Sequence, residues 1–196
     1  MTAVEAALRL IVADLVRSRQ RFALVGGFAV SARTEPRFTR DVDLVVAVAD
    51  DDDAEQVLRL LVTRGYQVVA TVEHDATHRL ATARLASPVA PGRELIVDLL
   101  FASSGVEHEI AARAAPLELL DGLTVPVATI GDLVALKLLS RDDDARPQDA
   151  ADLVALRGAA TGDDLAMARE TVALIAARGY ARGRDLVAAL DSLEHD

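Results

Sequence analysis

Two periodicities of apolar residues, one typical of helices and one typical of strands, alternate along the first 128 residues of the chain. Apolar positions at helical spacing predict helices over about Val4–Arg19, Phe28–Arg33, Ala54–Arg64 and Glu107–Ala115. The short apolar or alternating runs between them predict strands at Phe22–Val25, Val42–Val48, Tyr66–Val72, His78–Ala86, Glu94–Phe101, Leu117–Leu120 and Leu123–Val127. Helices and strands therefore alternate in this part of the chain.

The pattern changes at Thr129. A helix opens over Thr129–Asp132, and the chain stays helical to its end, with breaks at residues 142–147, 158–163 and 179–183. We therefore expect an α/β (α+β) fold. Residues 1–128 would form the α/β core, a sheet flanked by helices, and residues 129–196 a helical C-terminal region packed on that core.

Composition and charge exclude several classes of protein. The chain has no cysteine, which excludes disulfides, thiolate zinc sites and cysteine nucleophiles. Its formal charge of −10 argues against a large nonspecific nucleic-acid surface, although a local basic groove is compatible with it. The N-terminus has acids first and arginines later, the reverse of a secretory signal, and no apolar run is long enough for a membrane span. We expect a cytoplasmic protein without a membrane partner.

The segment from Phe22 to Val48 carries the main candidate chemistry. Its first strand ends at Gly26-Gly27, where no Cβ keeps a ligand from the backbone. Asp41 and Asp43 begin the next strand, and strand alternation places both on one side. Two close carboxylates repel each other unless a cation is shared, and Mg²⁺ accepts carboxylate, water and phosphate oxygens. The pattern therefore predicts a metal-bound phosphate site, and the alternative is a pair of acids that caps a strand in water.

Two further charged residues lie in apolar surroundings. Asp98 is a lone acid inside the predicted strand Glu94–Phe101, where burial is costly without a partner. It would complete a cluster of three carboxylates if this strand lies beside the one that starts at Asp41; otherwise it bonds to backbone amides. Lys137 is the single lysine among 21 Lys and Arg residues. It is either a charge directed at a phosphate or a chance survivor on the surface.

Other chemistries were weighed against this interpretation. His74 and His78 lack a third zinc ligand nearby, so we expect them to be exposed loop histidines. The Asp41–Val45 run also fits the haloacid-dehalogenase phosphatases, but there an apolar strand precedes the first Asp, whereas here it follows. A metal-dependent glycosyltransferase would use an Asp-x-Asp pair but gives no reason for the glycine turn or for Lys137.

The order of these motifs resembles a known superfamily. Gly26-Gly27, then Thr39-Arg40-Asp41-Val42-Asp43-Leu44, then Asp98 inside a strand resemble the nucleotidyltransferases related to DNA polymerase β. The downstream segments Leu136-Lys137-Leu138-Leu139 and Arg146-Pro147-Gln148-Asp149-Ala150-Ala151-Asp152 are similar to motifs of the AbiEii-type branch, whose members include toxins of toxin–antitoxin pairs. The likeness covers roughly residues 20–157. It implies a nucleotidyltransferase-like mixed sheet flanked by helices, with a helical C-terminal part.

The resemblance also implies roles for individual residues. Asp41, Asp43 and Asp98 would hold metal, with two Mg²⁺ ions expected and Mn²⁺ as a substitute, and Asp98 would also help to deprotonate the acceptor. The nucleotide would be bound by Gly26, Gly27, Arg40, Lys137, Arg146, Asp149 and Asp152, the last two orienting the bases. Lys137 is counted with the three acids as a catalytic residue.

The implied activity is Mg²⁺-dependent transfer of a nucleoside monophosphate from an NTP to an acceptor hydroxyl. For a toxin, the resemblance implies tRNA as the acceptor, at its 3′ end, and a cognate antitoxin as a partner. Two alternatives stay open: a catalytically inert nucleotidyltransferase fold that acts as a binding module, and an antibiotic nucleotidyltransferase of the aminoglycoside type, which an acidic surface would suit.

Overall fold

A mixed sheet forms the centre of the molecule. The structure, a computed structural model, describes residues 2–37, 39, 41–89, 95–141 and 147–195. These residues contain a seven-stranded sheet in the order β3-β4-β5-β2-β1-β7-β6. Its strands are β1 (Phe22–Val25), β2 (Val42–Val46), β3 (Gln67–Glu73), β4 (Leu80–Ala86), β5 (Ile96–Leu100), β6 (Ala115–Leu120) and β7 (Leu123–Val127). Because β2 pairs with β5 in parallel and with β1 in antiparallel fashion, the sheet is mixed, as the family resemblance implies.

Helices cover the sheet and extend the fold beyond it. They are α1 (Ala3–Arg17), α2 (Gly26–Arg33), α3 (Asp51–Thr63), α4 (Glu107–Arg113), α5 (Ile130–Ser140), α6 (Pro147–Ala159), α7 (Gly162–Ala177) and α8 (Leu186–His195). Several begin at a polar cap whose side chain accepts a hydrogen bond from a first-turn N–H, as the caps Thr2, Asp50, Thr129 and Thr161 do. The acids at residues 50–53 therefore start a helix, as predicted.

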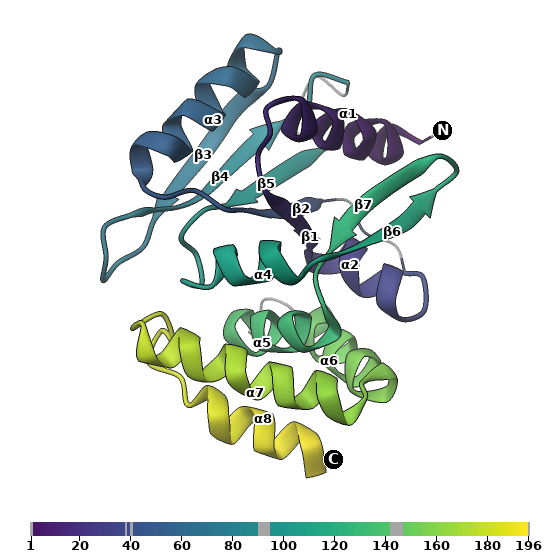
Figure 1. Ribbon diagram of the computed structural model, residues 1–196, viewed down its shortest axis with the longest axis vertical. Helices are drawn as coiled ribbons and strands as arrows, with labels where there is room; N and C mark the ends of the chain where they lie inside the picture. The colour runs from purple at the N-terminus through teal and green to yellow at the C-terminus, as the bar shows by residue number, and fades with distance from the viewer. Residues whose placement is uncertain (1, 38, 40, 90–94, 142–146, 196) are drawn as a thin grey trace.

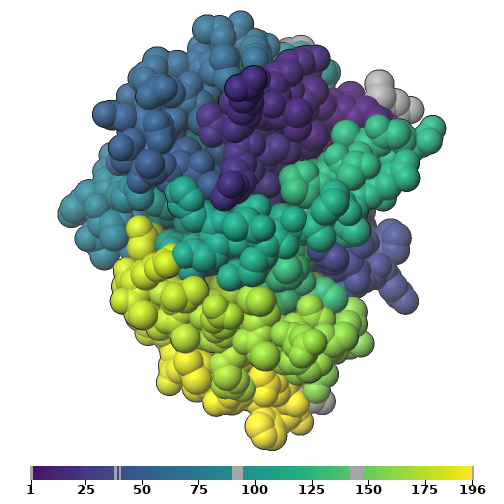
Figure 2. All heavy atoms as spheres, viewed as in Figure 1, coloured from purple at the N-terminus to yellow at the C-terminus, as the bar shows by residue number. Residues whose placement is uncertain are grey.

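The helices lie in layers around the sheet. Figure 1 shows α1 and α3 above the sheet, with α4 and the C-terminal helices α5–α8 below it. α5 and α6 pack against α2. One hydrophobic cluster runs through both parts of the chain and includes Leu44 of β2, Leu133 of α5 and Ile175 of α7. The space-filling view accordingly shows the C-terminal helices in continuous contact with the rest of the surface (Figure 2).

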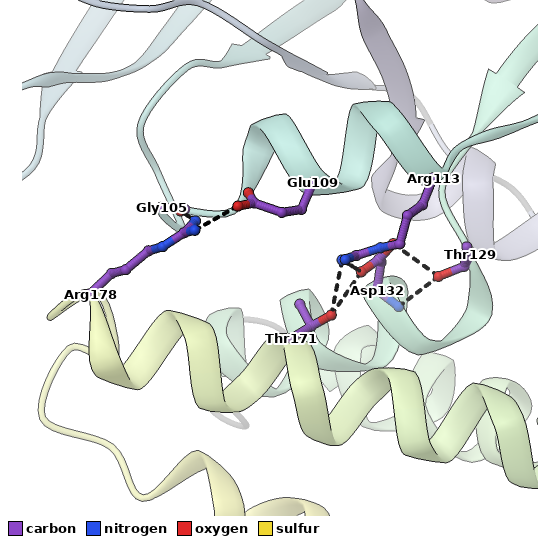
Figure 3. A network of polar contacts seen from close by, with 7 residues as sticks. All are labelled: Gly105, Glu109, Arg113, Thr129, Asp132, Thr171 and Arg178. Carbon is purple, nitrogen blue, oxygen red and sulfur yellow. Dashed lines mark hydrogen bonds and ion pairs between the residues drawn. The ribbon is translucent and has the colours of Figure 1, made fainter.

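A buried polar network attaches the C-terminal helices to α4. Asp132 of α5 is fully buried and accepts hydrogen bonds from Arg113 of α4, from Thr129 and from Thr171 of α7 (Figure 3). The Arg113 Nη2 to Asp132 Oδ1 distance is 2.6 Å. A buried carboxylate needs this many donors because its desolvation is otherwise uncompensated. The network therefore fixes how α5 and α7 sit against the core.

Two local expectations need correction, and a third falls partly outside the described residues. The second strand ends at Val46 and not at Val48, since residues 47 and 48 leave the strand before α3. The predicted fifth strand began at Glu94, which lies outside the described residues. His74 was expected to be exposed, but it is 8% exposed because its ring lies 4.2 Å from that of Tyr180. His78 is exposed, as expected.

Within the described residues, no helix combines the length and the apolar character that a bilayer crossing demands.

Candidate active site

Charged residues on three neighbouring strands lie in one row across the sheet. Asp43 on β2 is directly opposite Asp98 on β5, and Asp98 is directly opposite Arg84 on β4. Neighbouring strands are about 4.8 Å apart, so the two carboxylates start from adjacent positions. Asp41 precedes β2 and is exposed, whereas Asp98 is 7% exposed. The Asp98 strand thus lies beside the strand that starts after Asp41, the arrangement in which Asp98 would join Asp41 and Asp43.

The glycine turn leaves room for the Asp43 carboxylate. Gly26 has a φ of +65°, and a Cβ built on it would lie 1.9 Å from Asp43 Oδ2. A Cβ on Gly27 would lie 2.8 Å from both Arg37 Nη2 and Thr39 Oγ1. Side chains from the segment before β2 and from its start thus lie against the backbone of the turn. Only glycine fits Gly26, for both its left-handed conformation and this contact.

Lys137 lies between two carboxylates, and most of its side chain is shielded from solvent. Its side chain is 12% exposed, and its Nζ lies 2.6 Å from Asp149 Oδ1 and 2.8 Å from Asp152 Oδ2. Arg37 donates to the same Asp152 twice, from Nε to Oδ1 at 2.6 Å and from Nη2 to Oδ2 at 2.7 Å. Ser140 Oγ donates to Asp149 Oδ2 at 3.1 Å. Asp149 and Asp152, one helical turn apart on α6, therefore hold Lys137 of α5 and Arg37 in place.

One cavity brings the row, the glycine turn and Lys137 together. Its volume is about 590 Å³, within the usual range for small-molecule sites. The lining includes Gly26, Asp41, Asp43, Arg84, Asp98 and Lys137. Asp43 and Asp98 thus come from the sheet, and Lys137 and Asp149 come from the helical region. Such a lining suits a ligand that carries both a metal cation and an anionic group.

Arg84 is the cation that the structure places at Asp98. Arg84 Nε donates to Asp98 Oδ1 at 2.9 Å and Nη2 donates to Oδ2 at 2.7 Å. These hydrogen bonds raise the pKa of the Arg84 guanidinium; burial opposes them, and the charges of Asp98, Asp41 and Asp43 raise it further. All three carboxylates therefore act electrostatically on one positive group.

Asp41, Asp43 and Asp98 are the type of ligand that a hard metal ion takes, but the three carboxylates do not all point to one place. Asp41 and Asp43 offer carboxylate oxygens to one cavity, the ligand type that Mg²⁺ takes. Asp98, the third predicted ligand, is turned to Arg84. Across the described ranges, which omit residues 38, 40, 90–94 and 142–146, no three or more acids and histidines are grouped closely enough to hold an ion.

Two predicted nucleotide-binding residues, Arg40 and Arg146, lie outside the described residues. The remaining predicted site residues divide into two groups. Gly26, Gly27, Asp41, Asp43, Asp98, Lys137 and Asp149 line the cavity. Asp152 stands behind it and pairs with Lys137.

The polar residues of this cavity that sequence reasoning missed include Arg37, Arg84, Ser140 and Arg182. Arg84 gave a weak signal, because it interrupts the predicted strand His78–Ala86 and no face of that strand is purely apolar. Arg182 gave none, since it lies in the loop between α7 and α8. There it has a φ of +53° and donates to the Ser103 carbonyl and hydroxyl.

A glycine turn opposed to paired carboxylates on a mixed sheet defines the nucleotidyltransferase class of fold. The family described as "Nucleotidyl transferase AbiEii toxin, Type IV TA system" matches residues 9–196, and the chain belongs to that family. It is therefore a nucleotidyltransferase toxin of a type IV toxin–antitoxin system. The family implies an NTP substrate and a cognate antitoxin.

Solved structures share the fold at low sequence identity. An antigenic nucleotidyltransferase-like protein from Paracoccidioides brasiliensis is 19% identical, with a TM-score of 0.55, and the likeness covers 99% of this chain and 97% of that one. The lincosamide antibiotic adenylyltransferase LnuA, bound to lincomycin, is 15% identical with a TM-score of 0.53, over 80% of this chain and 98% of its own. ANT(2")-Ia, in complex with adenylyl-2"-tobramycin, is 17% identical with a TM-score of 0.51, over 97% and 98%. No curated protein matches the chain.

Proposed function

We propose that this protein transfers a nucleoside monophosphate from an NTP to a hydroxyl group at the 3′ end of a tRNA, with Mg²⁺ as the cofactor. The observation that carries the proposal is the cavity in which Asp41, Asp43 and Asp98 lie beside the Gly26-Gly27 turn, across from Lys137. Carboxylates that hold metal, bare backbone for phosphates and a buried cation are the parts that nucleotidyl transfer requires. An NTP donor and a tRNA acceptor place the reaction in the cytoplasm.

Each part of the cavity has a task in this reaction. The acceptor oxygen attacks the α-phosphorus, the bond to the β-phosphate oxygen breaks, and pyrophosphate leaves. Bound Mg²⁺ supplies charge neutralisation for the phosphates and would be held by Asp41 and Asp43, with Asp98 as the third ligand. Asp98 also accepts the acceptor proton. Lys137, fixed by Asp149 and Asp152, directs its ammonium toward the triphosphate.

A second cavity next to the first would give space for the acceptor beside the NTP. Its volume is about 580 Å³, and it shares Val72, Thr82, Ser103 and Arg182 with the first. Two neighbouring cavities with a common wall suit a reaction that joins two substrates.

The same cavity favours a second candidate function. Glu73 and Asp75 line it, and both are exposed acids. Acidic walls attract a cationic acceptor more than a polyanion. LnuA and ANT(2")-Ia share the fold and are described with lincomycin and with an adenylylated tobramycin. The second candidate is therefore transfer of a nucleotide to a small, cationic, hydroxylated compound such as an aminoglycoside.

The test uses NTPs labelled at the α-phosphate, each of the four bases in turn, with Mg²⁺ and either total tRNA or an aminoglycoside. We expect label on the tRNA, and none on tRNA whose 3′ terminal diol has been oxidised with periodate. Asp43→Asn should abolish transfer because it removes a metal-binding charge. Asp52→Asn is the matched control, since Asp52 is an exposed acid of α3 outside the cavity, and it should transfer normally.

The other outcomes separate the alternatives. Label on the aminoglycoside alone would replace the tRNA proposal with the second candidate. Binding of an NTP without transfer to any acceptor would favour the inert binding module. Undiminished transfer by Asp43→Asn would remove the proposed site.

A further inference from the structure

The Arg84–Asp98 pair is a bidentate ion pair between two residues that line the cavity. The two residues are direct cross-strand partners on β4 and β5, and both oxygens of Asp98 accept from the Arg84 fork. The Asp98 side chain is 11% exposed, whereas that of Arg84 is 48% exposed. The carboxylate is thus mostly shielded from solvent, whereas its guanidinium partner is about half exposed. Two parallel hydrogen bonds fix both the distance and the plane of the pair.

This pairing conflicts with the role that the proposed function gives to Asp98. A carboxylate that accepts a bidentate guanidinium has used the lone pairs that face its partner, so it cannot also ligate a metal from that side. Loss of Arg84 would leave Asp98 as an unpaired, nearly buried charge, which is strongly unfavourable, whereas the half-exposed Arg84 can be solvated by water.

The incoming substrate offers a replacement for each partner. A divalent metal would compensate Asp98, and a polyphosphate would compensate Arg84, which lines the same cavity as Asp43 and Asp98. A metal ion alone would satisfy Asp98 but leave the guanidinium without an anion. An NTP alone would satisfy Arg84 but leave Asp98 without a cation. Only the two together conserve the number of paired charges.

We propose that Arg84 is a positioning residue that holds Asp98 in the resting state and exchanges it for the NTP phosphates when a metal–NTP complex binds. The proposal rests on the proposed function and goes beyond it, because it makes metal binding at Asp98 conditional on the nucleotide. Arg84 thereby couples the two ligands, and such coupling commonly amounts to about 5- to 150-fold in affinity.

The experiment measures two affinities for each protein. Electron paramagnetic resonance of free Mn²⁺ gives the affinity for the metal alone, and calorimetry gives the affinity for a preformed complex of Mn²⁺ with an α,β-methylene NTP analogue. For Arg84→Gln we expect Mn²⁺ alone to bind about tenfold more tightly and the Mn²⁺–analogue complex about tenfold more weakly than to wild type. A residue that only stabilised the fold would move both affinities in the same direction.

Two further variants separate release of Asp98 from a general field effect. Arg84→Lys keeps the positive charge but cannot make the two parallel hydrogen bonds. We expect its affinity for Mn²⁺ alone to rise above that of wild type. Arg59→Gln removes an exposed arginine that pairs with Glu55 on α3, outside the cavity, and should change neither affinity. Circular dichroism checks that each variant folds.

The outcomes are decisive in both directions. Wild-type Mn²⁺ affinity in both Arg84→Gln and Arg84→Lys would overturn the exchange while leaving the proposed function intact. Mn²⁺ binding that is tighter than wild type in Arg84→Gln but unchanged in Arg84→Lys would mean that Arg84 acts through its charge alone. That outcome would also overturn the exchange. Failure of the wild type to bind the Mn²⁺–analogue complex would overturn the proposed function itself.

Discussion

Gly26 lies directly under the Asp43 carboxylate, so closely that a Cβ on Gly26 would come within 1.9 Å of Asp43 Oδ2. We predict that Gly26→Ala displaces Asp43 from the cavity and abolishes binding of the metal–NTP complex. It should also destabilise the fold by about 2 kcal/mol or more, because it adds a clash to the cost of a left-handed φ. Calorimetry and urea unfolding measure the two effects.

The chain offers a matched control for that substitution. Gly122, in the turn between β6 and β7, has a φ of +68° and no atom within 4 Å of an added Cβ. Gly122→Ala should therefore cost about 1 kcal/mol from backbone strain alone and leave nucleotide binding unchanged. Equal losses in the two variants would mean that the turn at Gly26 matters only for its backbone conformation.

Lys137 should prove essential to stability as well as to nucleotide binding. Lys137→Ala removes a buried ammonium from Asp149 and Asp152 and should cost about 3 kcal/mol, because breaking a buried pair leaves uncompensated charge. Arg37 still pairs with Asp152, so Asp149 bears most of the loss. Urea unfolding checks the value.

A double variant tests whether that cost comes from the stranded carboxylate. Lys137→Met with Asp149→Asn replaces both charges and should recover at least half of the stability lost in Lys137→Met alone. Stability in Lys137→Ala within about 0.5 kcal/mol of wild type would contradict the burial of this lysine. None of these Lys137 variants, single or double, is expected to bind an NTP normally.

The Arg113–Asp132 pair should control the attachment of the C-terminal helices. Among the described residues, Arg113→Ala leaves the fully buried Asp132 with Thr129 and Thr171 as side-chain donors. We expect a loss of about 3–5 kcal/mol in the free energy of unfolding. Arg169→Ala is the control: Arg169 makes two exposed ion pairs within the helical region, with Asp191 and Glu194, and its loss should have little effect.

Acid should weaken the contact between α4 and the end of α7. A hydrogen bond from Arg178 lowers the pKa of Glu109 below its usual 4.5, against the opposing effect of burial (Figure 3). Because the folded-state pKa is the lower one, this contribution to stability is present above pH 4.5 and is lost as the pH falls through the folded pKa. Glu109→Gln should therefore be less stable than wild type at neutral pH, with the gap closing in acid.

Thermal unfolding of both proteins across the acidic range measures that gap. A difference that stays constant down to about pH 2 would mean that ionisation of Glu109 does not contribute. A gap that widens in acid would reverse the sign of the linkage.

The sequence was sufficient for the order of elements and for the main neighbours in the site. Long periodic segments and polar caps predict the helices to within a few residues, as at α3, where Asp50 caps the first turn. The apolar run around Asp98 identifies a buried strand, and the structure sets it beside β2. These predictions succeed because they depend on local chemistry and on strand periodicity.

Contacts between distant segments escaped prediction. Arg37 and Asp152 are 115 positions apart, and nothing local indicates that they meet. Arg84 faces Asp98 because of the register of an antiparallel pair, which the packing of the whole sheet decides. His74 lies in a loop as predicted, but it was expected to be exposed, and the distant Tyr180 covers its ring. Such features depend on tertiary packing, so the bare sequence predicts the cavity and not the pairing inside it.

The grip of α6 on Lys137 and Arg37 has a consequence for chimeric proteins. Asp152 holds one cation from the helical region and one from the segment before β2, so a crossover near residue 128 would separate residues that neutralise each other. A chimera with a foreign helical segment would fold around mismatched charges unless Arg37 came from the same donor as α5 and α6. The helical segment and the segment before β2 therefore have to be exchanged together, although they are far apart in the sequence.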